Sequence, residues 1–518
     1  MLHACSQNRF VFLQPSVKVS SIESSTAGTE GGDSSQYREE VRRTVDIKFA
    51  NPVTMVRLQE ICSDKQVWIS GKCYTSGAIY SPIRSERFEA FKKRRLYREC
   101  ERCGFADTKP FGVGVELNAV YDCPACGGSD TFGPARQWLR PPGFAHPVFE
   151  QEVTSPDDMP QTSYATRAKL TMVTPAETAG WDHISPRLRV MTSRQHLLVS
   201  NTGPKKLGYT HCVACGSIEA DVTPEPKLFM PHAKPYPDDD STCPGDNARK
   251  HLVLGTDFIS DVALFSLRVE YPLILRPGTY PTSVALRTVS EALAKAACQL
   301  LDIEPGEIMA EYRPALTKDS AGRDGLQAEI FLYDTLPGGA GFSTQAARLG
   351  VALFKRASEL LKGCPEQCDS SCYRCLRSFK NKIEHHLLDR HVGSELVEYL
   401  LSGKIPEFNA ERVAASAHLL MTDLQRQYSD GIQFERDVKV TLASGDEVSI
   451  PILCRAANGR ALAIFISAPL TEDTVDEEAT ANRVADELGM SVVSVNELLV
   501  RENLPAATTE VQSEIKRL

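Results

Sequence analysis

The sequence predicts an α+β protein of several domains that is organised around small zinc-binding modules. Three observations lead to this prediction. Short β-like runs dominate the first half of the chain, whereas helical periodicity and mixed patterns follow. With 518 residues, 42% of them hydrophobic, the chain is long enough for about two to four domains with real cores. Most of the 16 cysteines lie in three close groups, and the isolated ones are Cys5, Cys62, Cys73, Cys298 and Cys454.

The composition also indicates where the protein resides. The sequence has no run of about eighteen apolar residues, and its first residues lack the cleavage site of a secretory signal. We therefore expect a soluble, cytoplasmic protein that does not associate with a membrane. In a reducing cytosol, clustered cysteines are better explained as metal ligands than as disulfides.

From the N-terminus we expect an extension with a flexible linker over residues 1–45, because residues 20–39 are rich in Ser, Gly, Thr and Glu. A β-rich region follows over residues 46–150, with β-like runs at 66–74 and 113–121. Two Cys-x2-Cys knuckles in this region, each followed by a glycine that permits a tight turn, predict a zinc ribbon. The ligands of this ribbon are Cys100, Cys103, Cys123 and Cys126.

The second cysteine group is incomplete on its own. Cys212 and Cys215 form one knuckle, and Cys243 is the single later cysteine nearby. A tetrahedral site needs a fourth ligand, so we expect a histidine to complete it. His232 is the first choice, followed by His251 and then His211, and a simple pair of core thiols is the alternative.

The third group is the densest, with four cysteines in the spacing C-x3-C-x3-C-x2-C. Four soft ligands connected by short turns predict one zinc ion in a closed, structural site, because no position is left for a catalytic water. An iron–sulfur cluster and free buried thiols remain the alternatives. The three groups together predict about three zinc ions per chain. The residues of the third group are Cys364, Cys368, Cys372 and Cys375.

The rest of the chain divides into residues 151–405 and a C-terminal α/β domain over 406–518. In the first part, strands are expected at 187–203 and 328–334, and helices at 283–303 and 344–363. In the second part we expect a helix at 411–428, three strands near Val438, Val448 and Ile464, a helix near Ala485 and a last strand at 491–495.

Several of these residues carry a resemblance to a known family. The stretch Tyr333–Phe342 ("YDTLPGGAGF") and the four cysteines are followed by Asn381, His385, Asp389 and Arg390. This pattern resembles the MrfA-type zinc-binding domain, which is found at the C-terminus of DEAD/DEAH-box helicases and in their stand-alone companions. As a separate chain it also resembles the DrmB family of helicase companions in the DISARM anti-phage system. The resemblance implies that a DEAD/DEAH-box helicase ATPase is the partner.

The sequence gives little support for catalysis by this chain. Neither "SGKC" at 70–73 nor "SGKI" at 402–405 has the upstream glycine and the hydroxyl of a P-loop. The glycines of 337–341 could cradle a phosphate, but a tight strand-to-helix turn is an equal explanation. The C-terminal domain resembles a degenerate restriction-endonuclease-like core, with apolar side chains where metal-binding carboxylates should be. His232, Lys234 and Asp239 match H-x-K-x4-D, so a phosphodiesterase remains an alternative.

The net charge of −9 argues against a surface that binds nucleic acid everywhere, but two basic runs stand out beside the cysteine groups. Tyr97, Tyr373 and Phe379 are interleaved with them and could stack on bases. A solvated surface is the alternative for each run, as is a structural His385–Asp389 pair on one helix. The candidate nucleic-acid-binding residues are Lys92, Lys93, Arg94, Arg95, Arg374, Arg377, Lys380, Lys382, His385 and Arg390.

The sequence therefore predicts a non-catalytic zinc-binding accessory subunit of a DEAD/DEAH-type helicase system. We expect it to bind DNA and to dock the ATPase in bacterial anti-phage defence or DNA repair. The C-terminal half of a split or truncated helicase is one alternative, and a phosphodiesterase that uses His232 is the other.

Overall fold

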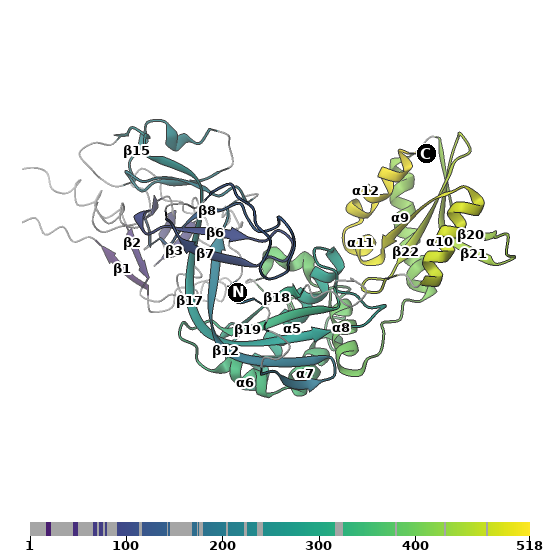
Figure 1. Ribbon diagram of the computed structural model, residues 1–518, viewed down its shortest axis with the longest axis horizontal. Coiled ribbons are helices and arrows are strands. Elements are labelled where there is room, and N and C mark those ends of the chain that lie inside the picture. The colour runs from purple at the N-terminus through teal and green to yellow at the C-terminus, as the bar shows by residue number, and fades with distance from the viewer. Residues whose placement is uncertain are drawn as a thin grey trace, which may run out of the picture.

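The structure, a computed structural model, has a β-rich region, a helix-covered middle region and a C-terminal α/β region along the chain (Figure 1). The residues that it describes are 17–21, 45–49, 66–69, 72–75, 78–79, 91–112, 116–141, 143–145, 168–173, 175, 180–203, 206–221, 225–235, 242–315, 325–378, 381–428, 431–472 and 475–517.

One long antiparallel hairpin is the backbone of the fold. β12 (Leu188–Asn201) and β17 (Ala248–Arg268) pair from Leu188↔Leu267 to Asn201↔Leu254. They belong to an 11-stranded sheet with the central order β10-β12-β17-β8-β6-β7. Its strands come from before and after residue 150 in the sequence. The other strands of this sheet are β6 (Arg95–Glu99), β7 (Ala106–Pro110), β8 (Arg136–Leu139), β10 (Lys169–Leu170), β11 (Asp182–Ser185), β13 (Tyr209–Cys212), β14 (Ile218–Ala220), β18 (Ile308–Ala315) and β19 (Gln327–Asp334).

Trp138 on β8 packs against β12 and β17, and so connects the strands before residue 150 with those after it. Its side chain is 2% exposed, and its indole N–H donates a hydrogen bond to Ser200 Oγ at 3.2 Å. A Cβ atom at Gly255 on β17 would overlap the indole, so this position needs glycine.

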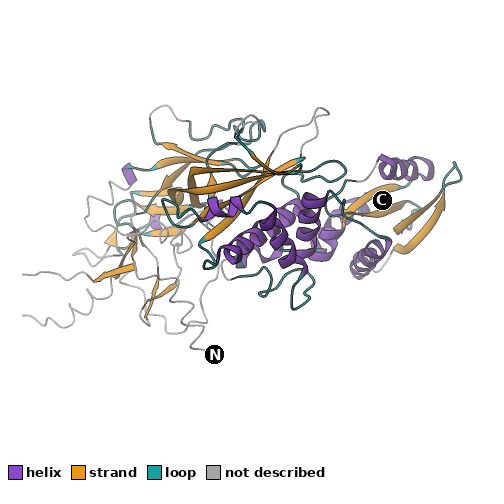
Figure 2. Cartoon of the chain, turned by 90° about the horizontal axis from the view of Figure 1, so that it is seen from below, coloured by secondary structure: helices purple, strands orange, loops and turns teal. Residues whose placement is uncertain are grey.

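A layer of helices covers the half of the sheet formed by β12, β17, β18 and β19 (Figure 2). Alanine, leucine and valine recur along the buried face of the first helix, as the sequence predicts. The helix expected at 344–363 is divided at Leu349–Gly350, because Gly350 has a φ of 53° that interrupts helical geometry. The helices are α5 (Tyr280–Leu301), α6 (Phe342–Arg348), α7 (Val351–Lys362), the 3₁₀ helix η4 (Lys382–Leu387) and α8 (Arg390–Ser402).

The C-terminal region has its own four-stranded sheet, in the order β20-β21-β22-β23, with the last pair parallel. The helices and strands expected from the sequence are present, and two further helices follow the last strand. A backbone hydrogen bond from Ile274 N to Leu470 O links this region to the middle one. The elements are α9 (Ala410–Gln427), β20 (Ile432–Thr441), β21 (Glu447–Ala456), β22 (Ala461–Ser467), α10 (Val475–Leu488), β23 (Ser491–Asn496), α11 (Glu497–Glu502) and α12 (Leu504–Ile515).

Smaller strands complete the β-rich region, and the β-like run expected at 66–74 forms a hairpin of two strands. The strand expected at 113–121 is wrong for the described residues 116–121, where Tyr121 makes only an isolated bridge to Phe132. Within the described part of the chain, no helix has the length and apolar character needed to cross a membrane. The remaining elements are β1 (Val17–Ser21), β2 (Val45–Phe49), β3 (Gln66–Ile69), β4 (Lys72–Thr75), β5 (Ala78–Ile79), β9 (Gly143–Ala145), η3 (Lys227–Phe229), β15 (His232–Ala233) and β16 (Thr242–Cys243).

Candidate metal centres

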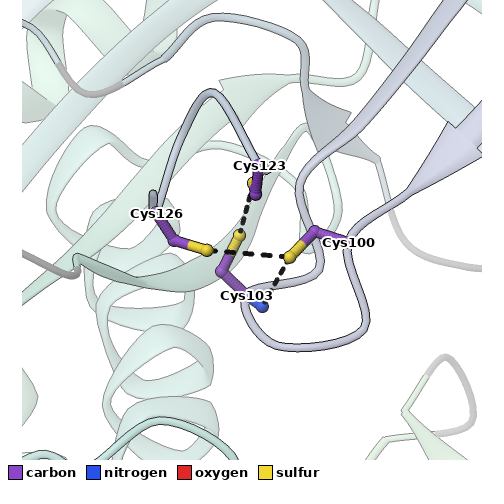
Figure 3. A group of neighbouring side chains, drawn as sticks. All are labelled: Cys100, Cys103, Cys123 and Cys126. Atoms are coloured by element: carbon purple, nitrogen blue, oxygen red, sulfur yellow. Dashed lines mark hydrogen bonds between the residues drawn. The ribbon is translucent and has the colours of Figure 1, made fainter. Parts of the chain in front are cut away.

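The first cysteine cluster lies directly after β6, where two knuckles face each other (Figure 3). Cys100 Sγ is 3.7 Å from Cys126 Sγ, and Cys103 Sγ is 3.6 Å from Cys123 Sγ. The glycine after each knuckle has a positive φ, 71° at Gly104 and 63° at Gly127, as the sequence pattern predicts. The backbone therefore turns tightly enough to direct all four thiols to one point.

The second cluster combines three thiols with His232. Cys212 Sγ is 3.6 Å from Cys243 Sγ, and Cys215 Sγ is 3.2 Å from His232 Nε2. His232 and Cys243 meet because β15 and β16 pair them directly across a short hairpin. His232 Nδ1 lies 2.8 Å from Met230 O. A carbonyl can only accept, so Nδ1 carries the proton, and the lone pair of Nε2 points toward the thiols, as in a metal-binding histidine.

The other two candidate histidines lie outside this cluster. His251 Nδ1 lies 3.0 Å from Leu207 O and 3.4 Å from a carboxylate oxygen of Asp221. His211 is buried against Ser217 O at 3.2 Å, and burial lowers its pKa to about 4 despite this hydrogen bond. A hydrogen bond with the Cys212 thiol lowers the pKa of Cys215. The lowered pKa favours the thiolate form of Cys215 beside His232.

The third cluster follows α7. Cys364 Sγ is 3.5 Å from both Cys368 Sγ and Cys372 Sγ, and Cys375 Sγ is 3.7 Å from both Cys368 Sγ and Cys372 Sγ. The thiols are contributed by one short loop, which packs against the helix layer.

All three clusters fit the demands of one metal ion. Within each of them the ligand atoms lie within 4.8 Å of one another. A tetrahedral ion with metal–sulfur bonds of about 2.3 Å has sulfur–sulfur edges of about 3.8 Å, close to the separations above. A disulfide would instead hold two sulfurs about 2 Å apart, and these cysteines are free. With four protein ligands each, the clusters can organise the chain around a metal but leave no position for substrate.

Two basic residues hold the loop of the third cluster. Arg390 Nε donates to Cys368 O at 2.7 Å, and its Nη1 donates to Leu361 O at 3.3 Å. Lys295 of α5 donates to Arg374 O at 3.1 Å and to Cys375 O, and burial lowers its pKa although the nearby cysteines oppose this shift. The motifs of the sequence do not indicate this role of Lys295, for which the one available signal is a lysine within a mostly apolar helix.

The segment after this loop does not form the single helix that was expected to carry His385 and Asp389. His385 lies in η4 and Asp389 caps α8, so the two residues are not on one helix. His385 Nε2 contacts Ser378 O and Asn381 Oδ1, both at 3.1 Å, and forms a polar network without Asp389. Asp389 instead caps α8 and pairs with Arg501 of α11 at 2.7 Å.

The basic run before the zinc ribbon is only partly exposed. Lys92 and Lys93 face solvent, but Arg94 stacks on the rings of Phe91 and Phe111, with its guanidinium carbon 4.3 and 3.8 Å from their centroids. Arg95 pairs with Asp257 at 3.2 Å.

Tyr97 is buried at 2% exposure and donates to Glu99 at 2.7 Å, so the expectation that it stacks on bases is wrong.

The basic run beside the third cluster is mixed. Arg374 and Lys382 are exposed, whereas Arg377 donates to Ser371 Oγ at 2.9 Å. Tyr373 is 64% exposed, with its ring edge-on to His385. Lys380 and Phe379 lie outside the described residues.

The glycine-rich turn after β19 already holds an anion that belongs to the chain. Asp334 is completely buried, and its carboxylate accepts hydrogen bonds from the backbone N–H groups of Ala340 (2.7 Å), Phe342 (3.0 Å) and Ser343 (2.7 Å). Gly341 N donates to Asp261 at 3.2 Å. The amides that could cradle a phosphate are thus occupied, so the turn serves the structure.

Replacing Asp334 with alanine is expected to lower the free energy of unfolding by about 3 kcal/mol, because three backbone N–H groups lose a completely buried acceptor. Urea unfolding measures this loss. Asp486→Ala removes an exposed carboxylate of α10 and is the matched control. A loss no larger than that of the control would show that the carboxylate does not hold the turn.

Comparisons with known proteins support part of the family resemblance. Residues 289–376 match the family model of the MrfA Zn-binding domain, a stretch that runs from α5 through the third cluster. The chain is 27% identical over 482 residues to Druantia protein DruE of Escherichia coli (strain UMEA 4076-1). This alignment covers 88% of the chain but 24% of the relative, so the chain spans about a quarter of the relative's length.

Among solved structures, the crystal structure of the DUF1998 helicase MrfA bound to DNA is similar over 43% of this chain and 24% of that chain. The TM-score is 0.24 and the sequence identity is 13%. Because DruE is a Druantia protein, the comparisons do not support the assignment to DISARM. The third cluster therefore lies in a stretch that matches the MrfA Zn-binding domain, within a chain that is similar to DruE.

Proposed function

We propose that this chain is a zinc-binding, helicase-associated module that binds DNA and docks a separate DEAD/DEAH-box ATPase in bacterial anti-phage defence or DNA repair. The match of residues 289–376 to the MrfA Zn-binding domain carries this proposal. The similarity to a Druantia protein favours the anti-phage setting. On this view each of the three clusters holds one zinc ion, with His232 as the fourth ligand of the second.

The chemistry of the described residues supports a non-catalytic role. A zinc ion bound by four protein side chains stabilises the fold, and the chain's own residues orient the ligands through Met230 O, Lys295 and Arg390. The glycine turn binds an internal carboxylate, and the sequence contains no P-loop. ATP hydrolysis is therefore assigned to another polypeptide or to another part of a longer one.

Two other functions make distinguishable predictions. The C-terminal part of a split helicase is supported by the alignment with about a quarter of a longer relative. It would restore ATP-dependent activity when combined with the missing part. A phosphodiesterase based on His232 is disfavoured, because Nε2 of this ring lies 3.2 Å from Cys215 Sγ in the metal cluster. It would predict DNA nicking that is lost in His232→Ala.

The test of the proposal is DNA affinity as a function of salt, measured with and without the ATPase, together with ATP turnover. The chain alone is expected to hydrolyse no ATP and to bind DNA weakly with a strong salt dependence. Lys92→Glu/Lys93→Glu should weaken binding and reduce the salt slope by about 2, because each lysine that contacts phosphate contributes about 1. Arg94 and Arg95 are left unchanged, since their internal contacts would confuse loss of binding with loss of structure.

Lys355→Glu/Lys516→Glu makes the same change in charge at exposed sites in α7 and after α12 and serves as the control. Identical salt curves for the unmodified chain and both variants would mean that Lys92 and Lys93 are solvated surface residues that do not contact DNA. The protein would then be a docking scaffold that does not touch DNA.

A further inference from the structure

An exposed strip runs along one face of the β12–β17 hairpin, between the zinc modules and the helix layer. The register pairs Arg194 with Asp261 and His196 with Ile259, and directly opposed residues of antiparallel strands project from the same face. Ile259 is 53% exposed and Leu336, in the turn that bonds to Ile259 O through Gly338 N, is 44% exposed. Ile259 on the sheet face and Leu336 in the adjoining turn therefore offer apolar contacts next to charged side chains.

Basic side chains accompany these apolar side chains. His196 Nε2 lies 2.9 Å from Asp257, and Arg95 and Arg140 each reach the same carboxylate at 3.2 Å. Arg194 is two residues before His196 on β12, with 62% of its side chain exposed. Residues i and i+2 of a strand are about 7 Å apart, which is close to the spacing of successive phosphates in an extended strand of nucleic acid.

The two carboxylates of the strip hold its basic side chains in place. The hydrogen bond from His196 and the charges of Arg140 and Arg95 lower the pKa of Asp257 despite its partial burial, so this carboxylate stays ionised. Arg140 uses one nitrogen for Asp257, and the rest of its 46% exposed side chain remains accessible. Arg194 is likewise held by Gly338 O and Asp261. Together with the neighbouring Arg95, the arginines of the strip outnumber these two carboxylates by one, so this surface carries a net positive charge in a chain of net charge −9.

We propose that this strip, made of Arg140, Arg194, His196, Ile259 and Leu336, binds a single strand of nucleic acid. The phosphates follow Arg140, His196 and Arg194, and the bases contact Ile259 and Leu336. A single strand fits better than a duplex, because the faces of its bases are accessible to apolar side chains. The inference rests on the proposed DNA-binding function and adds a second set of contacting residues to Lys92 and Lys93.

The test compares Arg140→Gln/Arg194→Gln with Arg348→Gln/Arg426→Gln, which removes two exposed arginines from α6 and α9. Fluorescence anisotropy with oligo(dT) and with a duplex of the same length gives the affinities across a salt series. The strip variant should bind oligo(dT) about fivefold or more weakly and lower the salt slope by about 1.4, whereas the control matches the unmodified chain. Ile259→Thr should weaken oligo(dT) binding without changing the slope.

Each outcome decides something. If the unmodified chain binds neither probe, the proposed function fails and the strip fails with it. If Lys92→Glu/Lys93→Glu weakens binding but the strip variant, folded by circular dichroism, equals its control, the strip alone is wrong. Equal loss for duplex and oligo(dT) would overturn the single-strand assignment. Unchanged DNA curves with weaker capture of the ATPase would make the strip a protein-docking surface instead.

Discussion

Cys372→Ser is expected to reduce the zinc content of the purified chain from three ions to two and to destabilise the middle region by at least about 3 kcal/mol. Cys372 Sγ lies 3.5 Å from Cys364 Sγ and 3.7 Å from Cys375 Sγ, so its loss opens the site. A metal ion bound by the four thiols of this cluster would fix the loop that packs against the helix layer, and binding energy of this kind is folding energy. Elemental analysis and urea unfolding in reducing buffer measure the two effects.

Cys298→Ser is the matched control, because Cys298 is buried in α5 but belongs to none of the three clusters. It should retain all three ions and lose only packing energy. If the unmodified chain, folded and reduced, contained one zinc ion or none, the assignment of three structural sites would be wrong.

Glu329→Gln is expected to lower the free energy of unfolding by about 3–5 kcal/mol, because it leaves a buried arginine without its counter-charge. Glu329 on β19 is completely buried and pairs with Arg313, its direct cross-strand neighbour on β18. Arg313 is 6% exposed and also donates to Met172 O, so its charge has no route to solvent.

The double variant Arg313→Met/Glu329→Leu should recover most of this loss, because both charges are removed together. Glu359→Gln breaks the exposed Arg356–Glu359 pair of α7 and should change stability by less than about 1 kcal/mol. A full double-mutant cycle by urea unfolding tests these expectations. A double variant as unstable as Glu329→Gln would show that packing, and not charge, is the cause.

The cysteine clusters could be anticipated from the sequence because most of their ligands lie within a few residues of one another. His232 was harder to identify, yet its place between Cys215 and Cys243 made it the first choice, and the β15–β16 hairpin brings it to the thiols. Local spacing carried this part of the site. The same reasoning failed for the basic run, because β6 is an inner strand whose successive residues, Tyr97 among them, are buried, and a partner 162 residues away binds Arg95.

Other differences also arise from contacts that no local pattern reveals. The break between α6 and α7 depends on the positive φ of Gly350, which a helical periodicity does not show. His385 and Asp389 have the spacing of one helix, but Asp389 caps α8 and binds Arg501 more than a hundred residues later. Sequence patterns therefore predict most helices and strands well. They predict only in part the long-range contacts that decide whether a polar side chain is exposed or bound within the protein.

The buried carboxylate of Asp334 has a consequence for timing. In a nucleotide-dependent loop, the anion arrives and leaves, and the order of the loop rises and falls with each turnover. Here the anion is covalently part of the chain, at 2.7 Å from Ala340 N and Ser343 N, so its supply never varies with the ATP level of the cell. This turn is therefore a constant element of the molecule. A conformational cycle driven by ATP would therefore have to originate in another part of the molecule or in another polypeptide.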